Sequence, residues 1–122
     1  MDSYSIYDML DSIQKRPGMY IGDIDLNNLK TYIHGYTRAM NDARIFDVSN
    51  PEFHGLHEFV RAKYNYFEST AGWANMIKAV VLGLDPENIS WEGYDKNITF
   101  EQQKQAMTKF YELLDEYKAT NA

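Results

Sequence analysis

The 122-residue sequence is 44% hydrophobic and 15% aromatic, a composition that supports the core of one folded domain and excludes an intrinsically disordered chain. Its 18 acidic residues outnumber its 12 lysines and arginines, and the net charge of -6 disfavours direct binding to nucleic acid while attracting basic proteins. With no cysteine, the sequence excludes disulfide bonds and thiolate metal sites.

Ten tyrosines and two tryptophans are a high aromatic content for this length. Aromatic side chains with a polar group are favoured in protein interfaces, and they also fill cores near the surface. The content favours a protein that binds other proteins, with a tyrosine-rich core as the open alternative.

The N-terminus, MDSYSIYDML, has no basic segment followed by an apolar run and so does not resemble a signal peptide. The longest apolar stretch, residues 77–84, is interrupted by Lys78 and Gly83 and falls short of the about 20 residues that a membrane-spanning helix needs. We therefore expect a cytoplasmic protein without a membrane partner.

The first predicted element is a helix over residues 3–15, because its apolar residues recur at helical spacing. Ser3 is placed to cap this helix, and Pro17 ends it because a proline excludes the preceding residue from the helical conformation. Residues 17–22 then predict a turn.

A second helix is predicted over residues 25–44 from one apolar stripe: Leu26, Leu29, Ile33, Tyr36 and Met40. Gly35 lies in this helix, where it lowers helix stability by roughly 1 kcal/mol relative to alanine. We interpret Gly35 as a packing glycine that lets another backbone approach, and we expect the 17–22 turn nearby.

Residues 46–54 are predicted to form a loop, with Asn50-Pro51 as its turn signal. A third helix follows over residues 56–64, and Asn65 is its predicted stop.

The fourth predicted helix is capped by Ser69 or Thr70 and is closed by Gly83. Residues 85–98 are rich in proline, glycine, asparagine and acidic residues, which predicts a loop. Within it, residues 89–91 are a candidate for a short extended segment.

The last helix has the clearest start signal, because Thr99 and Gln102 form a capping box. Its apolar face consists of Phe100, Ala106, Met107, Phe110, Leu113, Leu114 and Tyr117. Five amphipathic helices without a strong strand pattern predict an all-α fold, a compact single domain over residues 1–122.

Residues 16–23, RPGMYIGD, resemble a peptide in the ATPase domain of the gyrase B and MutL type. In that domain the following helix carries an asparagine and a glutamate for magnesium and water. Here Asn41 falls at the far end of the helix and no glutamate stands one turn before it. The seven glycines are scattered, so no glycine-rich lid is present to hold a triphosphate.

We therefore interpret RPGMYIGD as a structural corner. Arg16 lies at a helix C-terminus, where a cation interacts favourably with the helix dipole. Met19, Tyr20 and Ile21 then place apolar side chains against the adjacent helices.

Other catalytic chemistry has little support in the sequence. His54 and His57 have a spacing that could serve a metal with Glu52 or Glu58, but no third ligand has the usual spacing. No serine lies in a nucleophile pattern. We expect no enzymatic activity, no cofactor and no metal.

The helix ending in KRPGMYIGD, followed by LNNLKTYIHGYTRAM, resembles the opening of small bacterial immunity proteins of contact-dependent inhibition and related polymorphic toxin systems. The midchain FHGLHEFV, the Trp73 helix and the closing FYELLDEY fit the same pattern, so the resemblance spans roughly residues 6–117. It implies a protein that binds one cognate toxin domain, usually a basic nuclease, and blocks its active site or substrate surface. A helical adaptor domain without a toxin partner is the alternative.

Residues 85–95 combine carboxylates with large aromatic side chains, a pairing that interface hot spots favour. We predict that a toxin contacts Asp85, Glu87, Trp91, Glu92, Tyr94 and Asp95. One alternative is a merely solvated loop with Trp91 folded into the core. Another is binding at a second acidic patch, formed by Asp42, Asp47 and Glu52.

Calorimetry tests directly whether RPGMYIGD binds a nucleotide. Titration of ATP and magnesium into the protein should give no heat beyond dilution, because no run of backbone amides is free to hold the phosphates. Micromolar binding would show that RPGMYIGD does carry a nucleotide site.

Overall fold

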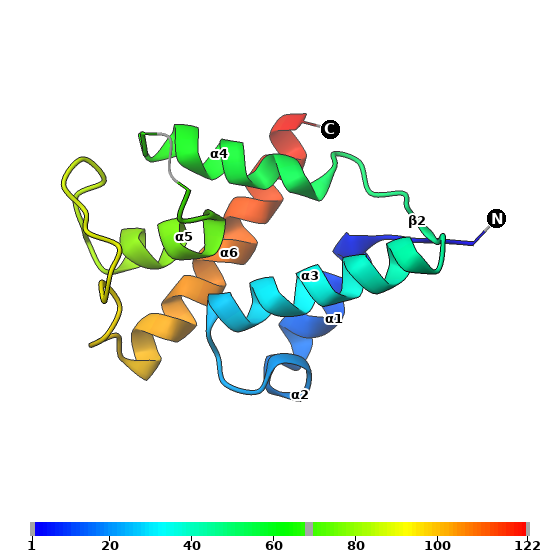
Figure 1. Ribbon diagram of the computed structural model, residues 1–122, viewed down its shortest axis with the longest axis horizontal. Helices are drawn as coiled ribbons and strands as arrows, with labels where there is room; N and C mark the ends of the chain where they lie inside the picture. Colours follow the sequence, from blue (N-terminus) through cyan, green and yellow to red (C-terminus); the bar gives the residue numbers. More distant parts are fainter. Residues whose placement is uncertain (1, 68–69, 122) are drawn as a thin grey trace.

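The computed structural model describes residues 2–67 and 70–121, which are mostly helical (Figure 1). In chain order the elements are β1 (Ser3–Tyr4), α1 (Ile6–Lys15), α2 (Pro17–Ile21), α3 (Leu26–Asp42), β2 (Phe46–Asp47), the 3-10 helix η1 (Phe53–Gly55), α4 (Leu56–Lys63), α5 (Trp73–Val81) and α6 (Phe100–Asn121). The prediction of an all-α fold is confirmed. Five of the six α-helices lie where the sequence predicts a helix, and α2 is the addition.

α5 lies at the centre of the bundle and contacts α3, α4 and α6 (Figure 1). Apart from Asn75 and Lys78, its sequence WANMIKAVV is apolar on every side, and six of its nine residues are buried. A helix with this composition is stable only when its neighbours cover it. α5 is therefore the element around which the core forms.

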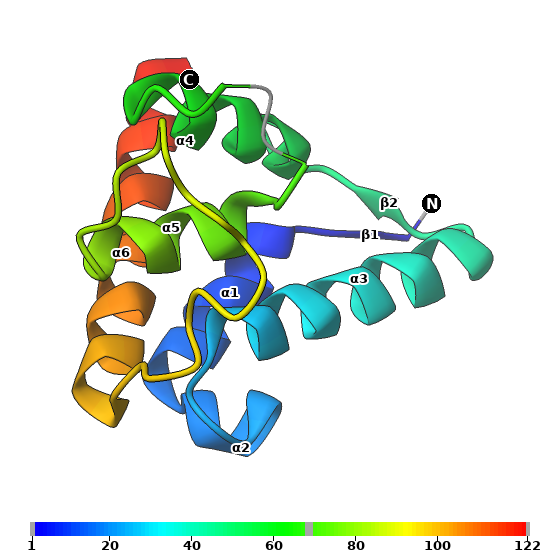
Figure 2. The ribbon, with the colours of Figure 1, turned by 60° about the vertical axis from the view of Figure 1, so that its left-hand side comes forward.

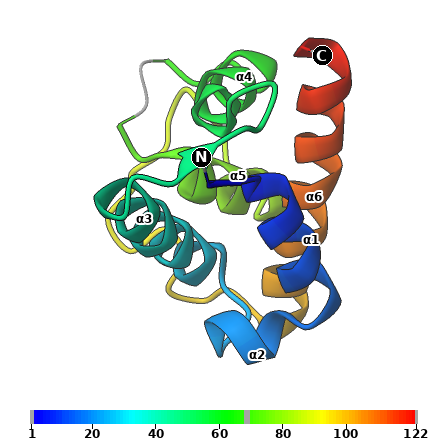
Figure 3. The same ribbon diagram turned by 90° about the vertical axis from the view of Figure 1, so that its right-hand side faces the viewer.

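α1, α3, α4 and α6 complete the core, with α6 along one side and α3 on the other, and α4 contributes Leu56 and Val60 (Figure 3). The buried side chains of the first two are Ile6, Tyr7, Leu10 and Ile13 of α1, and Leu26, Leu29 and Ile33 of α3. Those of α6 are Ala106, Met107, Phe110, Tyr111, Leu113, Leu114 and Tyr117. These stripes follow the helical spacing on which the sequence predictions rest.

The predicted capping box at the start of α6 is confirmed by reciprocal hydrogen bonds. The Thr99 amide donates to Gln102 Oε1 at 2.9 Å, and the Gln102 amide donates to Thr99 Oγ1 at 3.1 Å. The assignment of Phe100 to the apolar face is wrong, because 64% of this residue is exposed. It lies in the first turn, before the helix reaches the core.

The N-terminal segment departs from the prediction. Ser3 does not cap α1, which begins at Ile6 with Ser5 at the N-cap position. Ser3 instead pairs with Phe46 in a parallel β1–β2 ribbon. Two-residue strands are too short to produce an alternating sequence pattern, so the pairing is visible only in three dimensions.

The predicted turn after Pro17 is a short helix, α2, with proline at its first position, where no amide donor is needed. Met19 does not pack against adjacent helices as predicted, because 71% of it is exposed. Tyr20 and Ile21 are partly buried against the core. The RPGMYIGD corner therefore presents one large apolar side chain to solvent.

The start of α5 also differs. Its N-cap is Gly72, whose positive φ of 89° favours glycine, and Thr70 does not cap the helix. The alternative cap, Ser69, lies outside the described residues. Gly83 ends the helix as predicted, with a φ of 72°. Residues 89–91 form no strand.

The packing glycine is Gly55, and the prediction for Gly35 is wrong. Nothing lies within 4 Å of where a Cβ at Gly35 would stand. A Cβ at Gly55 would overlap the hydroxyl of the buried Tyr117, which donates a hydrogen bond to the Glu52 carbonyl at 2.5 Å. η1 can therefore approach α6 only with glycine at position 55.

This difference gives a matched pair of variants. Gly55→Ala should lower the free energy of unfolding by about 1–3 kcal/mol, because Tyr117 must move from its hydrogen bond. Gly35→Ala should raise it by roughly 1 kcal/mol through helix propensity alone. Urea unfolding measures both, and equal effects of the two substitutions would contradict the assignment.

Candidate functional site

The predicted toxin-binding loop is held from inside by Lys78. The Lys78 side chain is fully buried, and its Nζ lies 2.7 Å from Asp95 Oδ2 and 3.1 Å from Asp25 Oδ1. A buried ammonium needs such partners, because removal from water destabilises an unpaired charge by several kcal/mol. Asp95 is therefore a structural residue as well as a predicted contact.

The two aromatic residues of the loop also face inward. The Tyr94 hydroxyl donates to Asn75 Oδ1 at 2.6 Å, and burial raises the pKa of Tyr94 above its ordinary value. The Trp91 ring packs against Tyr94 and Tyr66, with centroid distances of 5.2 and 5.9 Å. For Trp91, this arrangement agrees with the alternative in which its side chain folds towards the core.

The outer side of the loop carries the remaining predicted residues. Asp85 is exposed but accepts hydrogen bonds from the Asn88 side chain and the Glu87 amide, which lower the pKa of its carboxyl. Glu87 and Glu92 are exposed. The structure thus divides the six predicted residues between an inner and an outer side, and does not gather them into one surface.

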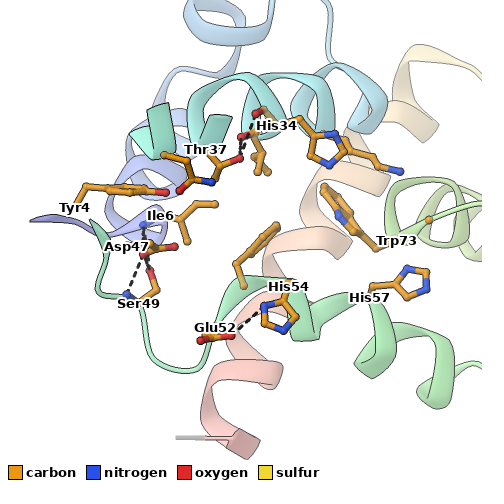
Figure 4. Close-up of a pocket in the computed structure, with 15 residues that line it drawn as sticks. Tyr4, Ile6, His34, Thr37, Asp47, Ser49, Glu52, His54, His57 and Trp73 are labelled. Carbon is orange, nitrogen blue, oxygen red and sulfur yellow. Dashed lines mark hydrogen bonds and ion pairs between the residues drawn. The ribbon is translucent and has the colours of Figure 1, made fainter. Parts of the chain in front are cut away.

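A second surface feature is a groove of about 620 Å³ between α3 and the segment from Asp47 to His57 (Figure 4). Its apolar lining comes from four separate elements, through Ile6, Ile33, Phe53 and Trp73. Phe53 and Trp73 meet edge to face, with centroids 5.9 Å apart. The sequence could not indicate this groove, because its walls are far apart along the chain.

The polar lining of the groove is uneven. Asp47 and Glu52 lie on one side of it, whereas His57 lies beside Trp73 (Figure 4). Lys30 is on the same side as Trp73, with its Nζ against Gly72. The groove therefore offers carboxylates at one end and a lysine with an imidazole at the other.

All three histidines line this groove, and His54 Nδ1 lies 3.1 Å from Glu52 Oε2. Across the described residues, no three histidine or acidic side chains are grouped as metal ligands would be. His34 of α3 therefore lies on the same surface as His54 and His57.

Two of the three residues of the second acidic patch lie at this groove. Asp47 and Glu52 line it, whereas Asp42 pairs with Arg38 at 3.2 Å on the surface of α3. Phe46 and Val48 flank Asp47 and are 56% and 61% exposed. Neither residue is among those that line the groove, so they form an apolar surface next to it.

Asp95→Asn and Glu92→Gln form a matched pair within one loop. Asp95→Asn should lower the free energy of unfolding by about 1–3 kcal/mol, because the buried Lys78 loses one of its two carboxylates. Glu92→Gln should leave it within roughly 0.5 kcal/mol, as expected for an exposed side chain. Thermal unfolding monitored by circular dichroism tests this, and an unchanged Asp95→Asn variant would mean that Asp25 alone satisfies Lys78.

Within the described residues, no helix has the length and apolar character to cross a membrane. In comparisons with known proteins, no family model, curated protein or solved structure matches the chain.

Proposed function

We propose that this chain is an immunity protein, which binds and neutralises one cognate toxin domain that has a basic surface. The resemblance of the opening KRPGMYIGD and the helix after it supports this class of function. A nuclease toxin is the favoured partner, because an enzyme that cuts nucleic acid needs a basic surface for phosphates. The inhibitor acts by covering that surface or the active site within it.

The observation that carries the proposal is the exposure of Phe46 and Val48 beside Asp47. Large apolar side chains that stand in solvent next to charged groups are typical of protein-binding surfaces. The neighbouring groove, with Phe53 and Trp73 in its lining, adds a recess for a partner side chain. We place the main contact here.

Charge supports the same class of partner. The net charge of -6 steers a basic protein towards this chain and accelerates association. Glu87 and Glu92, on the outer side of the predicted loop, are free to add long-range attraction. Contact through that loop remains a prediction for its exposed residues.

A helical adaptor without a toxin partner would use the same kind of surface. The neighbouring gene separates the two hypotheses, because a toxin or a large exoprotein reading frame supports the immunity function. A neighbouring gene for an unrelated enzyme or a phosphotransferase favours the adaptor.

The decisive experiment is protection of growth. Cells that express the neighbouring toxin domain should survive when this protein is co-expressed. The double variant Phe46→Ser, Val48→Ser should bind the toxin about tenfold or more weakly, because two apolar side chains are removed from the interface. Isothermal titration calorimetry gives the affinity.

Phe100→Ser is the matched control, since Phe100 is 64% exposed but lies in the first turn of α6, away from the groove. It should bind as the wild type does. Failure of the wild-type protein to protect cells would overturn the immunity function. Equal losses of affinity in the double variant and in Phe100→Ser would show that Phe46 and Val48 do not form the contact.

A further inference from the structure

The ten tyrosines divide into two groups according to what their hydroxyls do. Five donate hydrogen bonds within the protein: Tyr7 to the Pro51 carbonyl, Tyr66 to that of Met76, Tyr94 to Asn75, Tyr111 to the Leu10 carbonyl and Tyr117 to that of Glu52. Burial raises the pKa of Tyr7 and Tyr66 to about 12. Four of these five belong to the core and Tyr94 packs against it, so together they account for one half of the tyrosine content.

Four of the other tyrosines form a continuous row on the surface, which we call the tyrosine row. Tyr20 meets Tyr32 with a centroid distance of 6.1 Å, Tyr32 stacks on Tyr36 at 6.3 Å, and Tyr36 meets Tyr4 at 5.5 Å. All four are half-buried. Among the described residues, none of their hydroxyls has a hydrogen-bond partner.

Three elements build the row. Tyr32 and Tyr36 lie one turn apart on α3, Tyr20 comes from α2, and Tyr4 comes from β1. Figure 2 shows α2 below the first half of α3, and β1 beside its second half. The rings are therefore fixed by the fold before any partner arrives, which reduces the entropy lost on binding.

The row has an acidic residue near each end and an exposed apolar residue near one of them. Met19 precedes Tyr20 and is 71% exposed, and Asp23 follows shortly after. At the other end, Tyr4 pairs with Asp47 across the β1–β2 ribbon, and burial together with the Asp47 carboxylate raises the pKa of Tyr4. Tyr4 also lines the groove, so the row and the groove form one continuous surface.

We propose that the tyrosine row is the docking surface for an arginine-bearing segment of the basic partner protein. This inference rests on the proposed function and names the chemistry of its contact. Tyrosine ring faces attract cations, free hydroxyls accept hydrogen bonds, and a guanidinium supplies both the charge and several donors. The net charge of -6 favours the same ligand.

A single-stranded nucleic acid is the competing ligand for stacked aromatic rings. Such sites combine stacking with a positively charged groove along the phosphates. Here Arg38 of α3 is paired with Asp42, and the protein as a whole is acidic. The charge therefore favours arginine over a nucleic acid.

The test uses three short probes of equal length: a peptide of alternating arginine and serine, its lysine counterpart, and oligothymidine. NMR signals of the tyrosine rings report the site of binding, and their titration reports the affinity. The arginine peptide should shift the rings of the tyrosine row, and it should bind more tightly than the lysine peptide because guanidinium also stacks.

Substitutions then measure how much the tyrosine rings contribute to binding. Tyr32→Leu with Tyr36→Leu leaves the net charge unchanged and should weaken binding of the arginine peptide about five- to thirtyfold. Tyr64→Leu is the matched control, because Tyr64 is a half-buried tyrosine outside the row and should have no effect. Tyr32→Phe with Tyr36→Phe preserves packing and should weaken binding by only about twofold to fivefold, through the loss of two acceptors.

Four results would overturn the docking surface: equal affinity for both peptides, equal losses in the Tyr64 control, binding of oligothymidine at the row, or ring shifts that follow protein concentration without a probe. The last would identify a contact between two copies of the chain. The growth-protection assay tests the immunity function separately. If the variant with both Tyr32 and Tyr36 replaced still neutralises the toxin, the immunity function stands and the tyrosine row is not the docking surface.

Discussion

The ammonium group of Lys78 joins three segments of the chain that would otherwise be independent. It extends from the central helix α5 to Asp25, which caps α3, and to Asp95 in the loop before α6. Asp25 Oδ1 accepts hydrogen bonds from both the Asn27 amide and Lys78, so the start of α3 is positioned against α5. A buried charge tolerates few arrangements, and this triad selects one orientation of the loop.

That constraint decides which surfaces are left for a partner. With Asp95 tied to Lys78, Trp91 and Tyr94 turn inward onto Tyr66 and Asn75. The loop retains exposed carboxylates but no exposed aromatic anchor. The aromatic surface is instead found along α2, α3 and the β1–β2 ribbon, and the ribbon lies on the opposite side of the molecule from the loop (Figure 1).

The segment RPGMYIGD has a structural role in this fold, and that role requires no nucleotide. Pro17 begins α2, and Gly22, with a φ of 70°, ends it in a conformation that favours glycine. This short helix holds Tyr20 against Tyr32 and exposes Met19. The corner thus contributes to the docking surface that we propose.

The sequence by itself determined five of the six α-helices that the described residues form, because their signals are local. The spacing of Leu26, Leu29 and Ile33 and the capping box at Thr99 involve residues within one or two turns of each other. Only the tertiary structure decided that Gly55 rather than Gly35 is the close-packed glycine. It also decided which of the ten tyrosine hydroxyls form hydrogen bonds within the protein, and that the aromatic side chains of residues 85–95 face inward. Each depends on a contact between segments far apart in the chain, and no local pattern encodes such a contact.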